Sequence, residues 1–233
     1  GNNAADNSGV MTYVSICYAG ARSTQDIEHN GLTLNGVGNG TTIENIYVLE
    51  SADDAIEFFG GTVNVKNLLA VNPDDDMFDF TQGYCGTLSN CYGIWESDYT
   101  STEADPRGIE ADGNFDGLYP NHLRQSDFVV DGMTIVNNAA NTTDNVDRMQ
   151  DVIKIRRGAK ATIKNALVKG TGGAIDLVDM NDGKGAGNAA STISITNSLQ
   201  LTGKKLNGEA VLNEAGSNTG ADTSVFGWTK YNF

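Results

Sequence analysis

Two near-copies of one sequence unit follow each other between residues 41 and 83. The first reads TTIENIYVLESADDAIEFFGG and the second reads TVNVKNLLAVNPDDDMFDFTQG. Each copy contains a short segment of alternating apolar residues, an acidic turn, a second alternating segment and a closing glycine. The copies are 21 and 22 residues long and lack the 3.6-residue period of a helix. A strand-based repeat of this length predicts a stacked β-solenoid.

Further copies of the unit extend over most of the chain. Their first segments begin at Met11, Leu88, Val130, Ile163 and Ile195, and insertions occupy about 96–107 and 137–150. A β-sandwich also uses short strands, but it does not require a 22-residue register. We therefore expect an all-β fold, a parallel solenoid of about seven coils formed by a single domain over residues 1–233. Residues 1–10 are expected as a lead-in, and about 216–233 as a C-terminal cap or tail.

One position of the first segment carries asparagine in most copies. These residues are Asn45, Asn67, Asn90, Asn165 and Asn197, and Gly132 stands there in a sixth copy. Asparagine and glycine both tolerate a left-handed backbone, so this position predicts a bend within each coil. Stacked asparagines can also hydrogen-bond along the column.

The charge of the chain limits its partners. There are 30 acidic and 15 basic residues, which gives a net charge of −15. This balance argues against binding to nucleic acid or to an anionic membrane surface. It favours cation binding, or solubility alone. No run of about 18 apolar residues is present to form a membrane span.

The three cysteines leave two alternatives open. Cys85 and Cys91 are close enough in sequence to form a small disulfide in an oxidising compartment. Cys91 also occupies an inward strand position, where a buried free thiol is equally expected. The sequence does not decide whether Cys17 is paired or free.

The second segment of each copy predicts a column of charges on the outside of the solenoid. Its expected members are Glu57, Asp79, Glu110, Lys154 and Asp176. Stacked strands lie about 4.8 Å apart. Two carboxylates at that spacing repel by about 1 kcal/mol in water and by about 3–4 kcal/mol at an effective dielectric of 20. Such a column requires a metal ion, a cationic neighbour such as Lys154, or a shared proton, unless it is a solvated charge ladder.

The acidic turns are candidate Ca²⁺ sites, because Ca²⁺ accepts six to eight oxygen ligands in loose geometry. The candidates in the turns are Asp53, Asp54, Asp74, Asp75 and Asp76, with Asp105 in the following copy. A second candidate is the DGNFDG segment, whose Asp112, Asn114 and Asp116 match the start of an EF-hand loop. The glutamate expected at the twelfth position is absent, since Leu123 stands there, and a plain acidic turn is the alternative.

The insertions bring aromatic and basic residues to one edge of the solenoid. Trp95, Tyr99 and Arg107 are the candidates for ligand contacts. Aromatic rings stack on sugars, and arginine forks bind carboxylates, so these residues predict a glycan-binding groove. The alternative for Trp95 is a place in the core, because it directly follows Ile94.

Catalysis finds little support in the sequence. A Ca²⁺-assisted lyase would need a base near the substrate, for which Lys154 and Arg156 are the candidates. A polygalacturonase-like hydrolase would need a Gly-His-Gly segment, which is absent. No hydrolase elbow, zinc motif or phosphate loop appears either. Whether the protein is an enzyme stays open at this point.

The chain resembles right-handed parallel β-helix proteins of the pectin-lyase-like type, and more narrowly the secreted or surface β-helix proteins of Bacteroidetes and related bacteria. The resemblance rests on residues 8–21, 31–80, 107–114 and 153–170, and on Gly-Trp-Thr near Trp228. It implies right-handed coils, an extracellular or cell-surface location, and further N-terminal coils in relatives.

Three functions follow as hypotheses. The first is binding of an extracellular glycan or a neighbouring subunit, with Ca²⁺ stabilising the acidic turns. The alternative is a Ca²⁺-assisted polysaccharide lyase or glycoside hydrolase. The third is a structural stalk, adhesin or filament subunit that associates end to end through unpaired strand edges.

Overall fold

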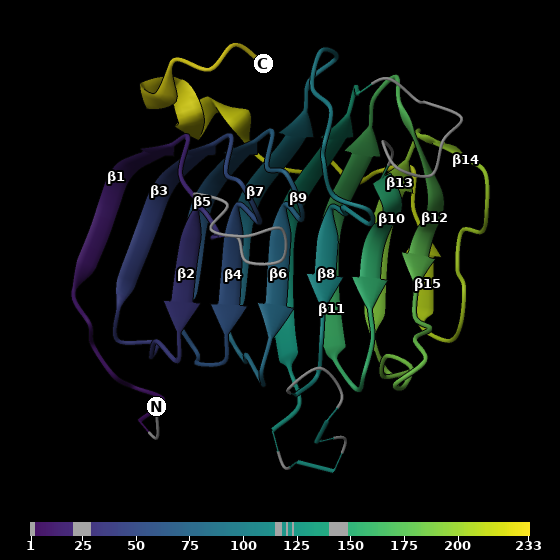
Figure 1. The fold of residues 1–233 in the computed structure, drawn as a ribbon, viewed down its shortest axis with the longest axis horizontal. Helices are drawn as coiled ribbons and strands as arrows, with labels where there is room; N and C mark the ends of the chain where they lie inside the picture. Colours follow the sequence, from purple (N-terminus) through teal and green to yellow (C-terminus); the bar gives the residue numbers. More distant parts are fainter. Residues whose placement is uncertain (1–2, 21–28, 115–117, 120, 123, 140–148) are drawn as a thin grey trace.

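The computed structural model describes residues 3–20, 29–114, 118–119, 121–122, 124–139 and 149–233. The chain alternates between two parallel sheets, one of eight strands and one of seven, and advances by one coil at each turn (Figure 1). The strands of the front sheet descend and those of the rear sheet ascend while the chain proceeds from left to right, which is right-handed winding (Figure 1). The prediction of a right-handed parallel β-helix is confirmed.

The long sheet consists, in spatial order, of β1 (Val10–Cys17), β3 (Thr42–Leu49), β5 (Asn64–Val71), β7 (Thr87–Trp95), β9 (Asp127–Asn137), β11 (Lys160–Lys169), β13 (Thr192–Asn197) and β15 (Val211–Glu214). The short sheet consists of β2 (Leu32–Asn35), β4 (Ile56–Phe59), β6 (Phe78–Thr81), β8 (Ile109–Ala111), β10 (Met149–Ile155), β12 (Gly173–Asp179) and β14 (Gln200–Leu201).

The core lies between the two sheets and runs the length of the stack. Alternate residues of each strand enter it, as Ile43, Ile46 and Val48 do from β3. Aromatic side chains stack along its axis: the rings of Phe58 and Phe80 are 5.1 Å apart, and those of Phe80 and Phe128 are 4.1 Å apart. Each coil therefore buries its apolar face against its neighbours.

The asparagine column forms as expected in most coils. Asn45, Asn67, Asn90 and Asn165 have φ angles of 49° to 58°, and Gly132 has a φ of 71°. Asn67 donates to Asn45 and Asn90 donates to Asn67, each at 2.9 Å, so the side chains form a ladder.

Asn197 does not belong to this column, so that prediction is wrong. β13 lacks the extra residue that forms the bend: Ile193 pairs with Ile163, but Ile195 pairs with Ala166. Asn197 is thereby opposite Val168 at the end of the strand.

The predicted register of the short sheet also needs one correction. Asp79, Glu110 and Lys154 stack as expected, but the residue opposite Lys154 is Asp179 rather than Asp176. The consecutive residues Leu177 and Val178 both point into the core, which changes the phase of the alternation. Asp176 is therefore three residues earlier, opposite Asp151.

The C-terminal segment returns along the stack. It passes Asn165, where Thr219 N donates at 2.7 Å, and then Asn90, where Asp222 N donates at 2.6 Å. It ends in the 3-10 helix η2 (Thr223–Thr229), drawn in yellow near the N-terminal coils (Figure 1). The tail therefore connects coils at both ends of the solenoid.

The tail covers an apolar patch on the outside of the long sheet. Phe226 packs there against a second cluster, separate from the main core, whose buried members from the sheet are Leu69, Val71, Tyr92, Ile94 and Val136. The outward positions of the middle coils of the long sheet are therefore apolar. These residues are buried because the tail, distant in sequence, lies on them.

The structure decides whether the cysteines form a disulfide and whether Trp95 lies in the core, two questions that the sequence left open. Cys17, Cys85 and Cys91 are all free thiols, and Cys91 is buried in the core. Trp95 is 2% exposed, and its indole N–H donates to the carbonyl of Pro73 at 2.9 Å. In the described part of the chain, no helix has the length and apolar character needed to cross a membrane.

Candidate functional site

Charged side chains form two parallel columns on the outer side of the short sheet. The strand column contains Glu57, Asp79, Glu110, Lys154 and Asp179. The corner column precedes it by three residues in every coil and contains Asp54, Asp76, Arg107, Asp151 and Asp176. We refer to the two columns together as the acidic face.

The two columns lie side by side because of the core residues between them. Between the two columns, two adjacent residues of a coil both point inward, such as Ala55 with Ile56 or Met77 with Phe78. This break in the alternation returns residues separated by three positions to the same side of the sheet. Accordingly, Asp54, Glu57 and Asp79 have carboxylate oxygens within 4.8 Å of one another.

In the C-terminal half of the acidic face, the carboxylates are paired with cations. Lys154 bonds Asp179 and lies 3.6 Å from Asp151. Arg107 and Arg156 both bond Glu110. Lysine and arginine therefore supply counter-ions to this half, although it also contains the oxygen triad Asp151–Asp176–Asp179.

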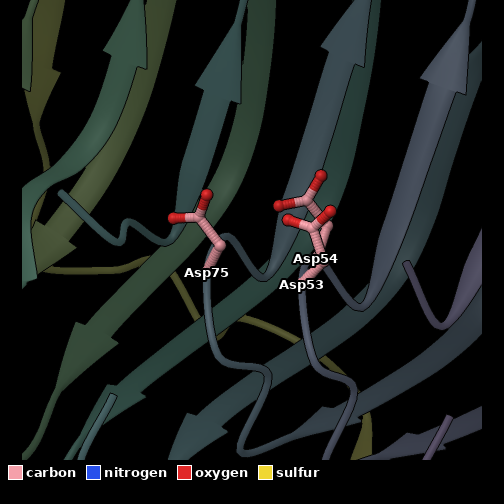
Figure 2. A group of neighbouring side chains, drawn as sticks. All are labelled: Asp53, Asp54 and Asp75. Atoms are coloured by element: carbon pink, nitrogen blue, oxygen red, sulfur yellow. The ribbon is translucent and has the colours of Figure 1, made fainter. Parts of the chain in front are cut away.

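The N-terminal half is different. Asp54, Glu57, Asp76 and Asp79 form no salt bridge with a lysine or arginine among the residues that the structure describes. Two triads of oxygens, each within 4.8 Å, share Asp79: Asp54–Glu57–Asp79 and Asp76–Asp79–Glu110. A third triad, Asp53–Asp54–Asp75, lies at the adjoining turns. Figure 2 shows Asp53 and Asp54 on one turn and Asp75 on the turn beside it.

Two of these carboxylates have buried oxygens without a partner. Asp76 is 3% exposed and Asp79 is 9% exposed. Within the described part of the chain, Oδ1 of each is buried and has no hydrogen-bond partner. A buried unsatisfied acceptor costs about 1–3 kcal/mol, and more when it carries charge. These oxygens therefore require either a proton or a cation.

The pKa values of these carboxyl groups also reflect burial without a compensating cation. Burial, with repulsion from Asp53 and Glu110, raises the pKa of Glu57 to about 7, although a hydrogen bond from Asn30 works against the shift. Burial and the charge of Glu110 raise the pKa of Asp75 to about 8. Burial and neighbouring carboxylates raise the pKa values of Asp76 and Asp79 well above the ordinary range. At neutral pH this half retains protons in the absence of a cation.

A cavity of about 310 Å³ opens at this half of the acidic face. Glu57, Asp79 and Glu110 line one part of it, and Thr81 and Leu118 line another. A ligand in this cavity would contact carboxylates directly, or through a cation that they hold.

Several predicted site residues have other partners. Asp74 accepts hydrogen bonds from Tyr99 Oη at 3.0 Å and from Thr102 N at 2.8 Å, so it anchors the insertion. Trp95 is buried and does not reach the groove. Arg107 lies in the acidic face: burial opposes its charge, but Asp76 and Glu110 outweigh burial and raise its pKa.

The predicted EF-hand-like loop is only partly described. Asp112 pairs with Arg156 at 3.1 Å and with Arg157 at 3.3 Å. Asn114 donates to the carbonyl of Arg124 at 2.7 Å. Asp116 lies outside the described residues, so Ca²⁺ binding by this loop stays a prediction.

The two candidate lyase bases are held in ion pairs. Lys154 bonds Asp179, and Arg156 bonds Glu110 and Asp112. Burial lowers the pKa of Arg156, but Glu110 and Asp112 outweigh it and raise that pKa above its usual value. A raised pKa makes proton abstraction by Arg156 harder.

Sequence reasoning missed Asp151 and Asp179. Their signal was present: a charged residue stands three positions before each strand-column residue, as Asp54 does before Glu57, Asp151 before Lys154 and Asp176 before Asp179. The rule became usable only when the register of β10 and β12 was known.

The comparisons address the family. A family model described as "Pectate-lyase like beta helix domain" matches residues 1–230. No curated protein and no solved structure gives a significant match. The two parallel sheets agree with the match. The chain therefore belongs to the pectate-lyase-like β-helix family.

Proposed function

We propose that the protein is an extracellular binding protein that holds Ca²⁺ in the N-terminal half of its acidic face and binds an acidic glycan beside it. The unpartnered buried oxygens of Asp76 and Asp79 carry the proposal. Asp79 belongs to both oxygen triads, and Glu57 and Glu110 complete the set around it. Hard oxygen donors from adjacent coils are the ligands that Ca²⁺ prefers.

Charge supports the glycan part of the proposal. A bound Ca²⁺ would reverse the repulsion between these carboxylates and an anionic sugar, because the ion accepts further oxygen ligands. Arg107 lies beside the cavity and already contacts Glu110. The acidic groups would therefore serve as an anion site only with the metal in place.

The metal is tested by thermal unfolding in Ca²⁺ and in excess EGTA. A ligand that binds only the folded state stabilises by RT ln(1 + [L]/Kd), about 2.7 kcal/mol at a hundredfold excess over Kd. We expect a clear increase in Tm with Ca²⁺ and no increase in the Asp79→Asn variant. The matched control is Asp127→Asn, on the long sheet, where Asp127 pairs with Lys160 at 3.1 Å. Equal Tm values for the unmodified protein in Ca²⁺ and EGTA would refute the metal site.

The glycan is tested by affinity electrophoresis in gels that contain polygalacturonate or alginate. We expect retardation in Ca²⁺, none in EGTA, and none for Asp79→Asn. Retardation that persists in EGTA would contradict a metal-dependent site.

The family membership keeps a Ca²⁺-assisted lyase or hydrolase as the second candidate. Unsaturated products that absorb in the ultraviolet, formed in Ca²⁺ and lost in Lys154→Ala, would favour the lyase over the binding protein. The ion pairs of Lys154 and Arg156 favour the binding protein.

A neighbouring subunit is an alternative ligand. β1 and the residue that follows it present three apolar side chains at exposures above one half, at an end of the solenoid: Val10, Tyr13 and Tyr18. Ordered multimers in light scattering, formed without glycan, would favour a stalk or filament subunit.

A further inference from the structure

A second cavity lies on the other side of the molecule, where the end of the C-terminal tail meets the long sheet. Its volume is about 390 Å³, within the range of small-ligand sites. Strands β7 and β9 and the residues that follow them form one wall, and Tyr231, Asn232 and Phe233 form the other. The acidic face belongs to the short sheet, so the two cavities are separate sites.

The floor and one wall are apolar and fixed in position. Tyr92 is 5% exposed, and Ile94 and Val136 are buried beside it. The ring of Phe233 makes T-shaped contacts with Tyr92 and Tyr231, with centroids 5.0 Å apart in both pairs, and a tilted contact with Phe226 at 5.9 Å. Phe233 nevertheless remains 49% exposed. About half of this side chain is therefore free of protein contacts, and the tail presents an aromatic surface that its neighbours hold in place.

The rim of the cavity carries both hydrogen-bond donors and hydrogen-bond acceptors. Glu96 accepts from Tyr231 Oη at 2.9 Å and from Asn72 Nδ2 at 3.0 Å, which fixes its carboxylate. Asn138 uses its Oδ1 to accept from Thr171 N at 3.1 Å, so its amide N–H groups are directed elsewhere. Lys169 is exposed at the opposite side. The rim thus offers acceptors and donors around an aromatic surface.

This combination selects one ligand class. A pyranose ring has an apolar face that stacks on an aromatic side chain, and hydroxyl groups that both donate and accept around its edge. One lysine balanced by Glu96 does not provide the concentrated positive charge that a polyphosphate needs. The polar rim does not suit an acyl chain.

We propose that this cavity binds a hexopyranose unit of a glycan, stacked on Phe233 and hydrogen-bonded by Glu96, Asn138 and Lys169. The site uses no metal. Together with the acidic face it would give the protein two independent glycan contacts on opposite sheets, which strengthens binding to a polymer through avidity.

Saturation-transfer difference NMR in EDTA tests this site alone, because EDTA removes any metal from the acidic face. The probes are the methyl pyranosides of glucose, galactose, mannose and glucuronic acid, each at millimolar concentration. We expect transfer to at least one probe, and about tenfold weaker binding in Phe233→Ala. Lys169→Ala should also weaken binding, and because Lys169 lies outside the aromatic contacts, its effect does not depend on the order of the tail.

Asp127→Asn is the matched control and should bind like the unmodified protein, because Asp127 pairs with Lys160 and lines neither cavity. Absence of transfer to all four probes would overturn the proposal. Equal binding by the unmodified protein, Phe233→Ala and Lys169→Ala would overturn it as well. The unmodified protein could lack Ca²⁺-dependent retardation in the glycan gels and still bind a pyranoside in EDTA. That result would refute the proposed function of the acidic face and support this site.

Discussion

At the scale of single residues, each asparagine of the column performs two roles that substitution can separate. Asn67 holds a φ of 58°, donates to Asn45 and accepts from Asn90. The left-handed conformation costs an ordinary residue about 1–2 kcal/mol. Each hydrogen bond contributes about 1 kcal/mol.

Asn67→Ala is therefore expected to lower the free energy of unfolding by about 2–4 kcal/mol, because it loses both the tolerated backbone and the side-chain bonds. Asn67→Gly keeps the backbone conformation and should lose about 1–2 kcal/mol. Urea unfolding of the two variants measures the difference. If glycine proved as destabilising as alanine, the backbone would not be the reason for asparagine at this position.

At the scale of elements, the C-terminal tail is held by its own small core. Phe226 is fully buried between the tail and the outer cluster of the long sheet. Ala221 N donates to Thr134 Oγ1 at 2.9 Å. Hydrogen exchange of this amide therefore reports whether the tail is attached to the sheet. The tail can therefore detach while the main core between the sheets stays intact.

Phe226→Ala should destabilise the attached tail by about 3 kcal/mol, the usual cost of removing a buried aromatic ring. We expect faster amide hydrogen exchange at Ala221, with little change in the strands of the main core. Val211→Ala, at an exposed position of β15, is the control. Uniformly faster exchange in all strands would show instead that the tail and the solenoid unfold as one unit.

At the scale of the whole molecule, the acidic face makes stability depend on pH in an unusual direction. Glu57 has a pKa of about 7 and Asp75 of about 8 in the folded protein, and both values lie above those of the unfolded chain. At pH values between the unfolded and the folded pKa values, the folded state therefore binds more protons than the unfolded chain. Its advantage is complete below the unfolded pKa values and is lost as the pH rises through about 7 to 8.

In EGTA, the Tm should accordingly decrease from pH 5 to pH 8, and calorimetry at several pH values checks this. Ca²⁺ would replace the protons, so the decrease should largely disappear when Ca²⁺ is present. Asp182 and Asp222 do not interfere, because their lowered pKa values place their titration below this range. A Tm that stays constant or rises with pH in EGTA would contradict the raised carboxylate pKa values.

The sequence by itself determined the coil. Alternating residues such as Ile46 and Val48, the asparagine bends and the stacking of Glu57 on Asp79 follow from a local period that repeats in every copy. A repeated local pattern is readable because each coil meets only its neighbours. The pairing of Asp79 with Glu110 across the first insertion was also predicted correctly, since both strands kept the same short pattern.

Only the tertiary structure decided the contacts that the period does not contain. The place of Asp179 depends on a change of phase at Leu177 and Val178, which local alternation conceals. Arg156 neutralises Glu110, whereas among the described residues Asp76 and Asp79 each keep a buried oxygen without a partner. This difference depends on which side chains meet after folding. The cavity beside Phe233 exists because the C-terminal tail lies on β7 and β9, which are distant in sequence, as the bond from Tyr231 to Glu96 shows. Such contacts arise from packing between distant segments, and no periodicity of the sequence encodes them.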